Sequence, residues 1–471
     1  MGQNSRTTSL LALAVVLALI SGVTAIGAWV QNFGPSAAGE TEPLAATSAP
    51  LLSARRVPNA LQKTVGAAEL SSDFDTIVAQ FPTSACVIAQ SEGLDLFESL
   101  NPETPLLPAS NLKLITTWAA LDQLGSNHRY QTQVTGDLDP DGVVTNLTVV
   151  GGGDPFLATA DWISQFSSIN GRTFTEFEDL IEQLTDAGVS EIIGDITVDE
   201  SRYDSQRVGP WAQRLIDQNQ SGPLSALAVN EGFDSWGTEL NLAGRTPSTN
   251  PAVSTGQLLV DQLVEQGVEF SGDVVTGDSS TNNILAAVES APLSDVITYI
   301  NSYSSNFGAE LLLKEISVST GNAGSTAAGA QVVTDLIASA GLSEAELTIR
   351  DGSGLSEANL ISCDLIRAVL DAATPALSGS LAISGLRGSL EDRFSDQSNS
   401  DGLIEAKTGT LRSATALSGY SESVVDNEIS ITFAIIANET QVSGRLVSLT
   451  SELALEFSKF PEAPSITELG P

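Results

Sequence analysis

The chain has 471 residues, and its 20 lysines and arginines against 58 aspartates and glutamates give a formal net charge of −38. This length predicts two or three domains rather than one, and 42% hydrophobic residues are enough to build packed cores. The charge argues against nucleic acid and anionic lipid as partners, because every phosphate would meet a repulsive field. One histidine and two cysteines leave few soft ligands, so we expect no metal and no other cofactor.

An apolar run from Leu10 to Ala28 follows Arg6 near the N-terminus. Such a run is typical of a signal peptide or a membrane anchor, so we predict an exported protein of the cell envelope and assign residues 1–30 to this segment. The small residues Val23-Thr24-Ala25 would suit cleavage, whereas the run approaches the ~20 residues that span a bilayer, and both outcomes stay open. The Pro- and Ser-rich composition that follows predicts a linker over residues 31–71.

The next segment predicts the first part of an α/β domain, which we assign to residues 72–134. Short alternating runs predict strands at Ser84–Gln90 and Leu94–Leu100, joined as a hairpin at Glu92-Gly93. Apolar residues at helical spacing then predict a helix that begins near Ala109 and ends at Gly125.

Residues 135–289 are predicted to be inserted, because their many strands and turn dipeptides differ from the segments on either side. A strand is predicted at Asn146–Val150, directly before three glycines. Helices are predicted at Phe174–Ala187, Glu191–Val198 and Thr255–Gln266.

The last part of the chain, residues 290–462, predicts the second part of the α/β domain, and residues 463–471 a tail. The predicted helices of this part are Pro292–Ile300, Asn306–Ser317 and Gly444–Phe460. The predicted strands are Leu403–Thr410, Ala414–Tyr420 and Ile429–Asn438, and a turn at Asp426-Asn427 joins the last two strands.

The two cysteines, Cys86 and Cys363, lie 277 residues apart but can be neighbours in the fold. Disulfides persist outside the cytoplasm. A disulfide between them and two buried free thiols are both compatible with the sequence.

Two of the five lysines lie in motifs that can carry chemistry. Lys113 stands three residues after Ser110 at the start of a predicted helix, so the two side chains share a helix face. If Lys113 is desolvated, its ammonium form is disfavoured and its amine can take the serine proton. This pattern would supply a serine nucleophile without a histidine; the alternative is an ordinary helix start.

The second lysine, Lys407, opens a Lys-Thr-Gly-Thr sequence on a predicted strand. Its cation can meet a substrate carboxylate, and Gly409 lets a substrate backbone approach the strand, although exposed strand lysines are common. Between the two lysines, Ser304 and Asn306 lie at a predicted helix–turn–helix junction. A hydroxyl and an amide there could relay a proton and hold a carbonyl, or they could cap a helix.

The order Ser-x-x-Lys, Ser-x-Asn, Lys-Thr-Gly resembles that of the penicillin-recognising serine enzymes. The 193 residues between Ser110 and Ser304 are more than a class A β-lactamase would hold there. Together with Gly151-Gly152-Gly153-Asp154-Pro155 and the loop Asp351–Ser356, this spacing is similar to that of class C low-molecular-mass penicillin-binding proteins, which are D-alanyl-D-alanine carboxypeptidases and often endopeptidases.

The resemblance implies an α/β fold with a transpeptidase-like (β-lactamase-like) penicillin-binding domain and two smaller inserted domains. It implies that Ser110 is the acylated nucleophile and Lys113 its base, and that Ser304 relays a proton to the leaving group beside Asn306. The middle residue of this second motif is Ser305, where many relatives carry Asp; we expect catalysis to tolerate it.

The resemblance also implies that Lys407 with Thr408 binds a terminal carboxylate and that Gly409 admits the substrate. The backbone N–H groups of Ser110 and Thr410 would form an oxyanion hole. The implied substrates are peptidoglycan stem peptides, and the implied inhibitors are β-lactam antibiotics that acylate the serine. A β-lactamase and a catalytically inactive cell-wall-binding protein are the alternatives.

Overall fold

The computed structural model of the chain describes residues 57–91, 96–166, 173–237, 244–279, 281–343, 345–395, 397, 400–426 and 428–462. Residues 59–471 form one compact unit. The predicted signal or anchor segment, residues 31–56 of the predicted linker, the predicted turn at Glu92-Gly93, the predicted tail and Asn427 of the predicted C-terminal turn lie outside the described residues. Within the described ranges, no helix combines the length and the apolar character that crossing a membrane requires.

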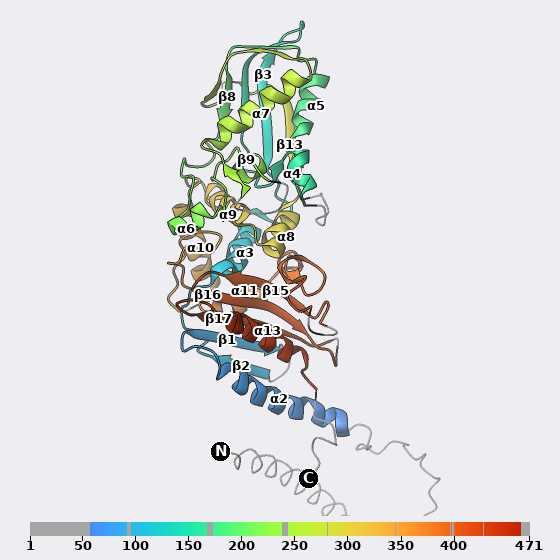
Figure 1. Cartoon of the computed structure of the whole chain (residues 1–471), viewed down its shortest axis with the longest axis vertical. Helices are drawn as coiled ribbons and strands as arrows, with labels where there is room; N and C mark the ends of the chain where they lie inside the picture. Colours follow the sequence, from blue (N-terminus) through green and yellow to red (C-terminus); the bar gives the residue numbers. More distant parts are fainter. Residues whose placement is uncertain are drawn as a thin grey trace, which may run out of the picture. The chain divides into compact units, whose positions relative to one another are not determined.

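A six-stranded antiparallel sheet joins the two ends of the chain (Figure 1). Its strands, in spatial order, are β14 (Ala382–Ile383), β15 (Ile404–Thr410), β16 (Ala414–Glu422), β17 (Ser430–Asn438), β1 (Ala85–Ser91) and β2 (Leu96–Leu100). The predicted N-terminal hairpin and the three predicted C-terminal strands are therefore confirmed. They meet where β1 pairs with β17, with Val87 opposite Ile435.

Both faces of this sheet are covered, because its central strands carry apolar side chains on both sides. In β1, Val87 and Ala89 enter one core while Cys86 and Ile88 enter the other, as the two-residue period of a strand requires. The first core is closed by α2 (Val57–Val78) and α13 (Gly444–Ser458). The second is closed by α3 (Leu112–Leu124), α8 (Leu293–Tyr303), α9 (Asn306–Ser319), α10 (Thr326–Ala340), α11 (Cys363–Asp371) and α12 (Pro375–Ser378).

Helix α2 corrects the predicted linker over residues 31–71, whose last part is helical. Leu70, Phe74 and Ile77 recur at helical spacing and are buried in the first core. The linker prediction rested on the Pro- and Ser-rich residues before position 60. It extended too far because the apolar residues that mark the helix appear only near the end of the predicted linker.

The insertion builds a second, seven-stranded sheet. Its strands are β3 (Gln131–Leu138), β4 (Val143–Val150), β7 (Glu191–Ile193), β8 (Ile196–Asp199), β11 (Glu269–Ser271), β12 (Val274–Thr276) and β13 (Ile284–Glu289), and α5 (Glu178–Asp186) and α7 (Pro251–Glu265) pack on it. Because β3 begins at Gln131, the predicted boundary between residues 134 and 135 cuts through a strand.

The predicted helix at Glu191–Val198 is wrong, since these residues form β7 and β8. Gly194 separates the two strands with φ +85°, a conformation that favours glycine and ends β7. Both strands pair with β4. Ile192, Ile196 and Val198 therefore enter the core of the second sheet, whereas Ile193, which points to the other face of β7, is exposed.

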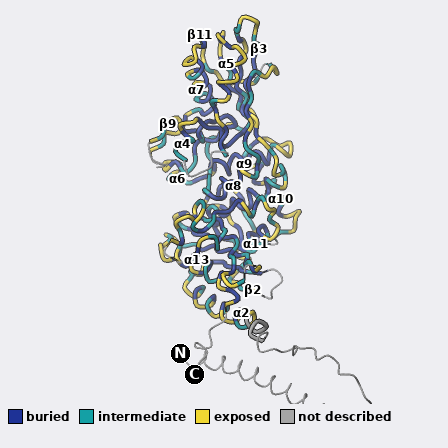
Figure 2. Tube along the Cα trace, turned by 90° about the vertical axis from the view of Figure 1, so that its right-hand side faces the viewer, coloured by how far each residue is buried: buried dark blue, intermediate teal, exposed yellow. Residues whose placement is uncertain are grey.

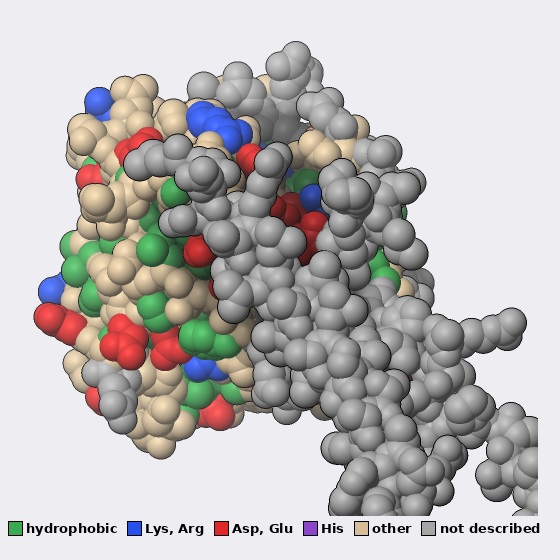
Figure 3. Space-filling model, turned by 90° about the horizontal axis from the view of Figure 1, so that it is seen from below, with side chains coloured by type: hydrophobic (Ala, Val, Ile, Leu, Met, Phe, Trp, Pro, Cys, Tyr) green, Lys and Arg blue, Asp and Glu red, His purple; other side chains and the backbone are tan. Residues whose placement is uncertain are grey.

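Smaller elements fill the remainder of the described chain. They are β5 (Leu157–Ala158), α4 (Ala160–Ser164), β6 (Thr175–Glu176), α6 (Gln213–Asp217), β9 (Phe233–Ser235), β10 (Thr246–Pro247) and the short 3-10 turns η1 (Ala109–Asn111), η2 (Asn230–Gly232) and η4 (Gly388–Leu390). Figure 2 shows α8 and α9 largely buried, whereas the turns beside β3 and β11 are exposed. The face in Figure 3 carries Asp and Glu side chains among hydrophobic ones, with Lys and Arg at scattered points.

Cys86 in β1 and Cys363 at the start of α11 form a disulfide with a Cα–Cα distance of 5.9 Å. The structure thereby decides between the two alternatives left by the sequence. The bond ties a strand from the first part of the domain to a helix from the last part, 277 residues later.

Removing this disulfide is expected to destabilise the protein, because it closes a very long loop in the unfolded chain. We expect the Cys86→Ala/Cys363→Ala variant to lose ~3–5 kcal/mol of unfolding free energy. Thermal unfolding of the full chain would show this as a lower Tm, and reduced wild-type protein should unfold near the same temperature. Equal Tm values for the variant and the oxidised wild type would contradict this prediction.

Candidate active site

Ser110 lies in η1, the turn that leads into α3. Ala109 precedes it with φ +48°, a backbone conformation that costs a residue other than glycine about 1–3 kcal/mol. The neighbouring loop allows this turn because it presents Gly354, where a Cβ would stand 1.9 Å from the carbonyl oxygen of Ala109. A strained turn therefore holds the serine at the start of a helix, as the sequence predicts.

Lys113 is fully buried one helical turn after the serine. Its Nζ lies 2.9 Å from Oγ of Ser110, 2.7 Å from Oδ1 of Asn306 and 2.7 Å from the carbonyl oxygen of Ser353. A neutral amine has two N–H groups and one lone pair. With the N–H groups donated to Asn306 and Ser353, the lone pair is left facing the hydroxyl of Ser110.

The charge state of Lys113 follows from its surroundings. Burial lowers the pKa of Lys113 to about 7, while the nearby carboxyls of Asp351 and Glu310 act in the opposite direction and raise it. The amine is therefore substantially neutral near neutral pH, as general-base catalysis requires.

The second motif spans the junction between α8 and α9. Ser304 ends α8 in the left-handed region with φ +61°. Ser305 is the N-cap of α9, where its Oγ accepts a hydrogen bond from the N–H of Gly308 at 3.1 Å. Ser304, Ser305 and Asn306 all line the pocket. The Nδ2 of Asn306 also donates to the carbonyl oxygen of Gln220 at 2.7 Å.

The third motif lies on β15, which passes directly beside η1. Gly409 permits this approach, because a Cβ there would lie 3.1 Å from the backbone nitrogen of Ser110. The buried Lys407 donates to Oγ of Ser304 at 2.9 Å. Burial and the charge of Lys113 lower the pKa of Lys407 far below its ordinary value. A substrate carboxylate beside the amine would raise that pKa again and draw a proton onto it.

These motifs meet at a pocket of about 490 Å³. Its wall includes Ser110, Ser304, Asn306, Thr408 and Thr410, so the structure brings together the residues that the sequence selects. Lys113 and Lys407 lie immediately behind this wall, where they bond to Ser110 and Ser304. Phe166, Tyr299 and Tyr303 form an aromatic part of the same wall.

Sequence reasoning missed several contributors to this site. Ser353 takes part through its backbone carbonyl, which no residue type reveals, and Gln220 does the same. Glu310 is fully buried and follows Asn306 by one helical turn. The signal for Glu310 in the sequence is an acidic residue among the apolar residues of a predicted helix, a position where acids are rarely buried without a partner.

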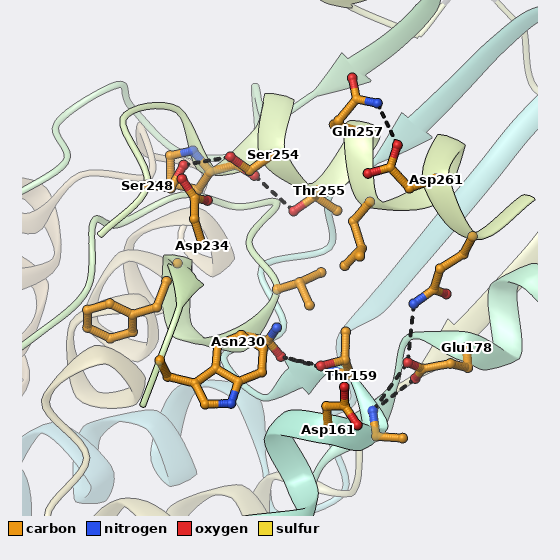
Figure 4. Close-up of a pocket in the computed structure, with 18 residues that line it drawn as sticks. Thr159, Asp161, Glu178, Asn230, Asp234, Ser248, Ser254, Thr255, Gln257 and Asp261 are labelled. Carbon is orange, nitrogen blue, oxygen red and sulfur yellow. Dashed lines mark hydrogen bonds between the residues drawn. The ribbon is translucent and has the colours of Figure 1, made fainter. Parts of the chain in front are cut away.

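A second pocket, of about 480 Å³, opens between α4, α5, β9 and α7 (Figure 4). Asp161, Glu178, Asp234 and Asp261 lie around it, and the described residues that line it include no Lys or Arg. The pocket holds none of the residues that the motifs select.

Comparison with known proteins agrees with this geometry. The sequence pattern of the D-Ala-D-Ala carboxypeptidase 3 (S13) family matches residues 72–248 and 239–453. The chain belongs to this family. A D-alanyl-D-alanine carboxypeptidase of Actinomadura is 29% identical over 455 residues, which cover 79% of this chain and 81% of the relative. A carboxypeptidase of Mycobacterium tuberculosis is 30% identical over 366 residues, 75% of each chain.

Solved structures of the same general fold include penicillin-binding protein 4 of Haemophilus influenzae. It has a TM-score of 0.67 and 19% identity, over 82% of this chain and all of that one. Its complex with a β-lactam has a TM-score of 0.65 and 20% identity. The α/β penicillin-binding fold implied by the motifs is therefore confirmed, and as a member of the S13 family the protein is a serine hydrolase.

Proposed function

We propose that the protein removes terminal D-alanine from peptidoglycan stem peptides and also cleaves D-alanyl cross-links between them. One observation carries the assignment of the chemistry: a buried lysine amine lies 2.9 Å from the hydroxyl of Ser110, with both of its N–H groups directed elsewhere. Membership of the S13 family and the two carboxypeptidase relatives support D-alanyl peptides as the substrate class.

Acylation begins when Lys113 takes the proton of Ser110 and the serine oxygen attacks the carbonyl carbon of the penultimate D-alanine. The negative charge then moves to the carbonyl oxygen, where the backbone N–H groups of Ser110 and Thr410 receive it. Such a donor is worth ~10²–10³ in rate. Asn306 contributes by holding Lys113, and its amide also lies at the wall of the pocket.

The tetrahedral intermediate collapses when the C–N bond breaks, and the leaving amine must gain a proton. Ser304, whose Oγ lies at the pocket and accepts a hydrogen bond from Lys407 at 2.9 Å, relays this proton. The proton that Lys113 took from Ser110 replaces the one that Ser304 gives up, so Lys113 becomes neutral again. The terminal carboxylate binds at Lys407 and Thr408. Water then attacks the acyl-enzyme and gives a proton to the neutral Lys113, which passes it to the oxygen of Ser110 as the acyl bond breaks and the shortened peptide leaves.

A β-lactam would acylate the same serine, since its strained amide resembles the D-alanyl-D-alanine bond. The β-lactam complex of penicillin-binding protein 4 supports β-lactams as ligands of this fold. The apolar N-terminal run supports export to the cell envelope, where the substrate lies.

The test is to incubate the full chain separately with a stem-peptide analogue ending in D-alanyl-D-alanine and with benzylpenicillin. We expect free D-alanine from the first incubation and a persistent covalent adduct of one penicillin in the second, measured by intact mass. Rapid hydrolysis of penicillin without an adduct would indicate a β-lactamase. Intact penicillin, no adduct and no released D-alanine would indicate the inactive wall-binding protein.

The acylation rate is expected to rise with pH through about 7. The lysine must be neutral to accept the serine proton, and burial lowers the pKa of Lys113 to about 7 from the ordinary value of 10.5. Below this pH the amine is protonated and the rate falls tenfold per pH unit. The second-order rate constant for benzylpenicillin, measured between pH 5 and 9, checks this, and a limb near pH 10 would contradict the buried neutral amine.

A further inference from the structure

Glu310 is a buried acid that the mechanism above does not use. It lies on α9 one turn after Asn306, and its side chain faces the same side of the helix. Its Oε1 accepts hydrogen bonds from the backbone N–H groups of Gly352 at 3.1 Å and Ser353 at 2.8 Å. Its Oε2 is buried and has no hydrogen-bond partner among the described residues.

The loop that Glu310 holds is the one that contacts the base. Thr116 of α3 donates to the carbonyl oxygen of Gly352 at 2.8 Å, so the loop is fixed from a second helix as well. Gly352 allows this close packing, because a Cβ there would stand 2.4 Å from the carbonyl oxygen of Ala309. The next carbonyl, that of Ser353, accepts from Nζ of Lys113 at 2.7 Å.

The neighbouring acid has a different role. The carboxylate of Asp351 accepts from the N–H groups of Gly354 at 3.0 Å and Ser356 at 2.6 Å, and from the side chains of Asn359 at 2.7 Å and Trp211 at 3.0 Å. Four donors satisfy it within its own loop and its immediate surroundings. Glu310 is therefore the carboxyl that connects this loop to α9 and to the second motif.

We infer that Glu310 is a positioning residue for Lys113. Glu310 fixes the loop whose Ser353 carbonyl accepts one N–H of the neutral amine. Asn306, on the same helix α9, accepts the other N–H through its Oδ1. The lone pair is then held toward Ser110. The inference rests on the proposed function, in which Lys113 is the base.

The charge of Glu310 also bears on the base. The titratable groups that face Lys113 are Glu310 on α9, Asp351 on the loop and Lys407 on β15. Burial raises the pKa of Glu310 to about 8, and repulsion from Asp351 acts in the same direction. A neutral Glu310 leaves the Lys113 amine neutral, whereas an ionised one attracts a proton onto it.

The test compares the acylation rate of the full chain by benzylpenicillin between pH 5 and 9 in three variants. Glu310→Gln keeps an acceptor oxygen for the loop but removes the charge. Glu310→Leu removes both. Glu315→Gln is the matched control, because Glu315 is a buried acid on the same helix whose carboxylate binds Arg202 and Tyr203 instead.

We expect Glu310→Leu to acylate about 10²-fold more slowly at every pH, as misplacement of a reacting group does. Glu310→Gln should keep the wild-type rate within a few-fold at every pH, and the acid limb of its profile should stay near pH 7, because the raised pKa of Glu310 leaves its carboxyl largely neutral there. Glu315→Gln should lower Tm but leave the profile of the folded protein in place.

A wild-type acylation rate in Glu310→Leu would overturn the inference. A rate in Glu310→Gln as low as that of Glu310→Leu would also overturn it, because the carboxyl would then act chemically and not by position. A displaced acid limb in Glu310→Gln would also overturn it, because the carboxyl would then act through its charge. If Glu310→Leu does not fold, a rate in Glu310→Gln within a few-fold of wild type supports the inference and a hundredfold loss overturns it. Failure of the wild-type protein to acylate would instead contradict the proposed function.

Discussion

Replacing Ser110 by alanine is expected to abolish the penicillin adduct and to lower D-alanine release by more than ~10⁴-fold, because Ser110 is the pocket hydroxyl that lies 2.9 Å from the amine of the base Lys113. The side chain is small and at the pocket surface, so Tm should stay near that of the wild-type protein. Intact mass after incubation with benzylpenicillin and an assay for free D-alanine check the two parts.

A matched control is Ser353→Ala. Ser353 contacts Lys113 through its backbone carbonyl, which the substitution retains. It should therefore still form the adduct. An adduct on Ser110→Ala would show that a different residue is the nucleophile, and the mass of its labelled peptide would identify that residue.

Replacing Lys113 by methionine is expected to slow acylation by ~10²–10⁴-fold, which is the usual contribution of a general base. Methionine has a similar length but cannot take the proton of Ser110. The lysine is fully buried, and an apolar side chain there removes the cost of desolvating an amine. The substitution also removes the donor to Oδ1 of Asn306 and to the carbonyl oxygen of Ser353, so Tm is measured alongside to separate a catalytic loss from an unfolded protein.

The pH profile makes this second prediction specific. The residual acylation of Lys113→Met should lack the limb near pH 7, because the group whose pKa burial lowers to about 7 is gone. The second-order rate constant, measured over the same pH range as for the wild type, provides the check. A limb that persists unchanged in Lys113→Met would assign it to another group and contradict the role of this lysine.

The motifs of the site were readable from the sequence because the chemistry needs particular side chains in order. The sequence indicates Ser110 with Lys113, Ser304 with Asn306, and Lys407. These residues meet in space because strands from the two ends of the chain pair in one sheet. The sequence predicts that pairing only through its resemblance to a family. The α/β character of the two terminal segments was predictable from the residues themselves, because clear strand and helix periodicities lie at both ends of the chain.

What could not be predicted depends on contacts rather than on residue types. The Ser353 carbonyl is a backbone group, so the sequence gives no sign that it binds Lys113. The lowered pKa of Lys113 depends on burial, which only the packed structure shows. The sequence suggests Ser304 or Asn306 as a helix cap, whereas in the structure Ser305 caps α9.

The pairing of β1 with β17 has a consequence for how the protein is made. Lys407 leaves the ribosome 407 − 110 = 297 residues after Ser110, a delay of about 15–60 s at ~5–20 residues per second. Throughout this interval the nascent chain already contains the nucleophile and its base but lacks β15 and the strand that pairs with β1. A chain arrested or truncated before this point cannot assemble the pocket, so incomplete products carry no reactive serine.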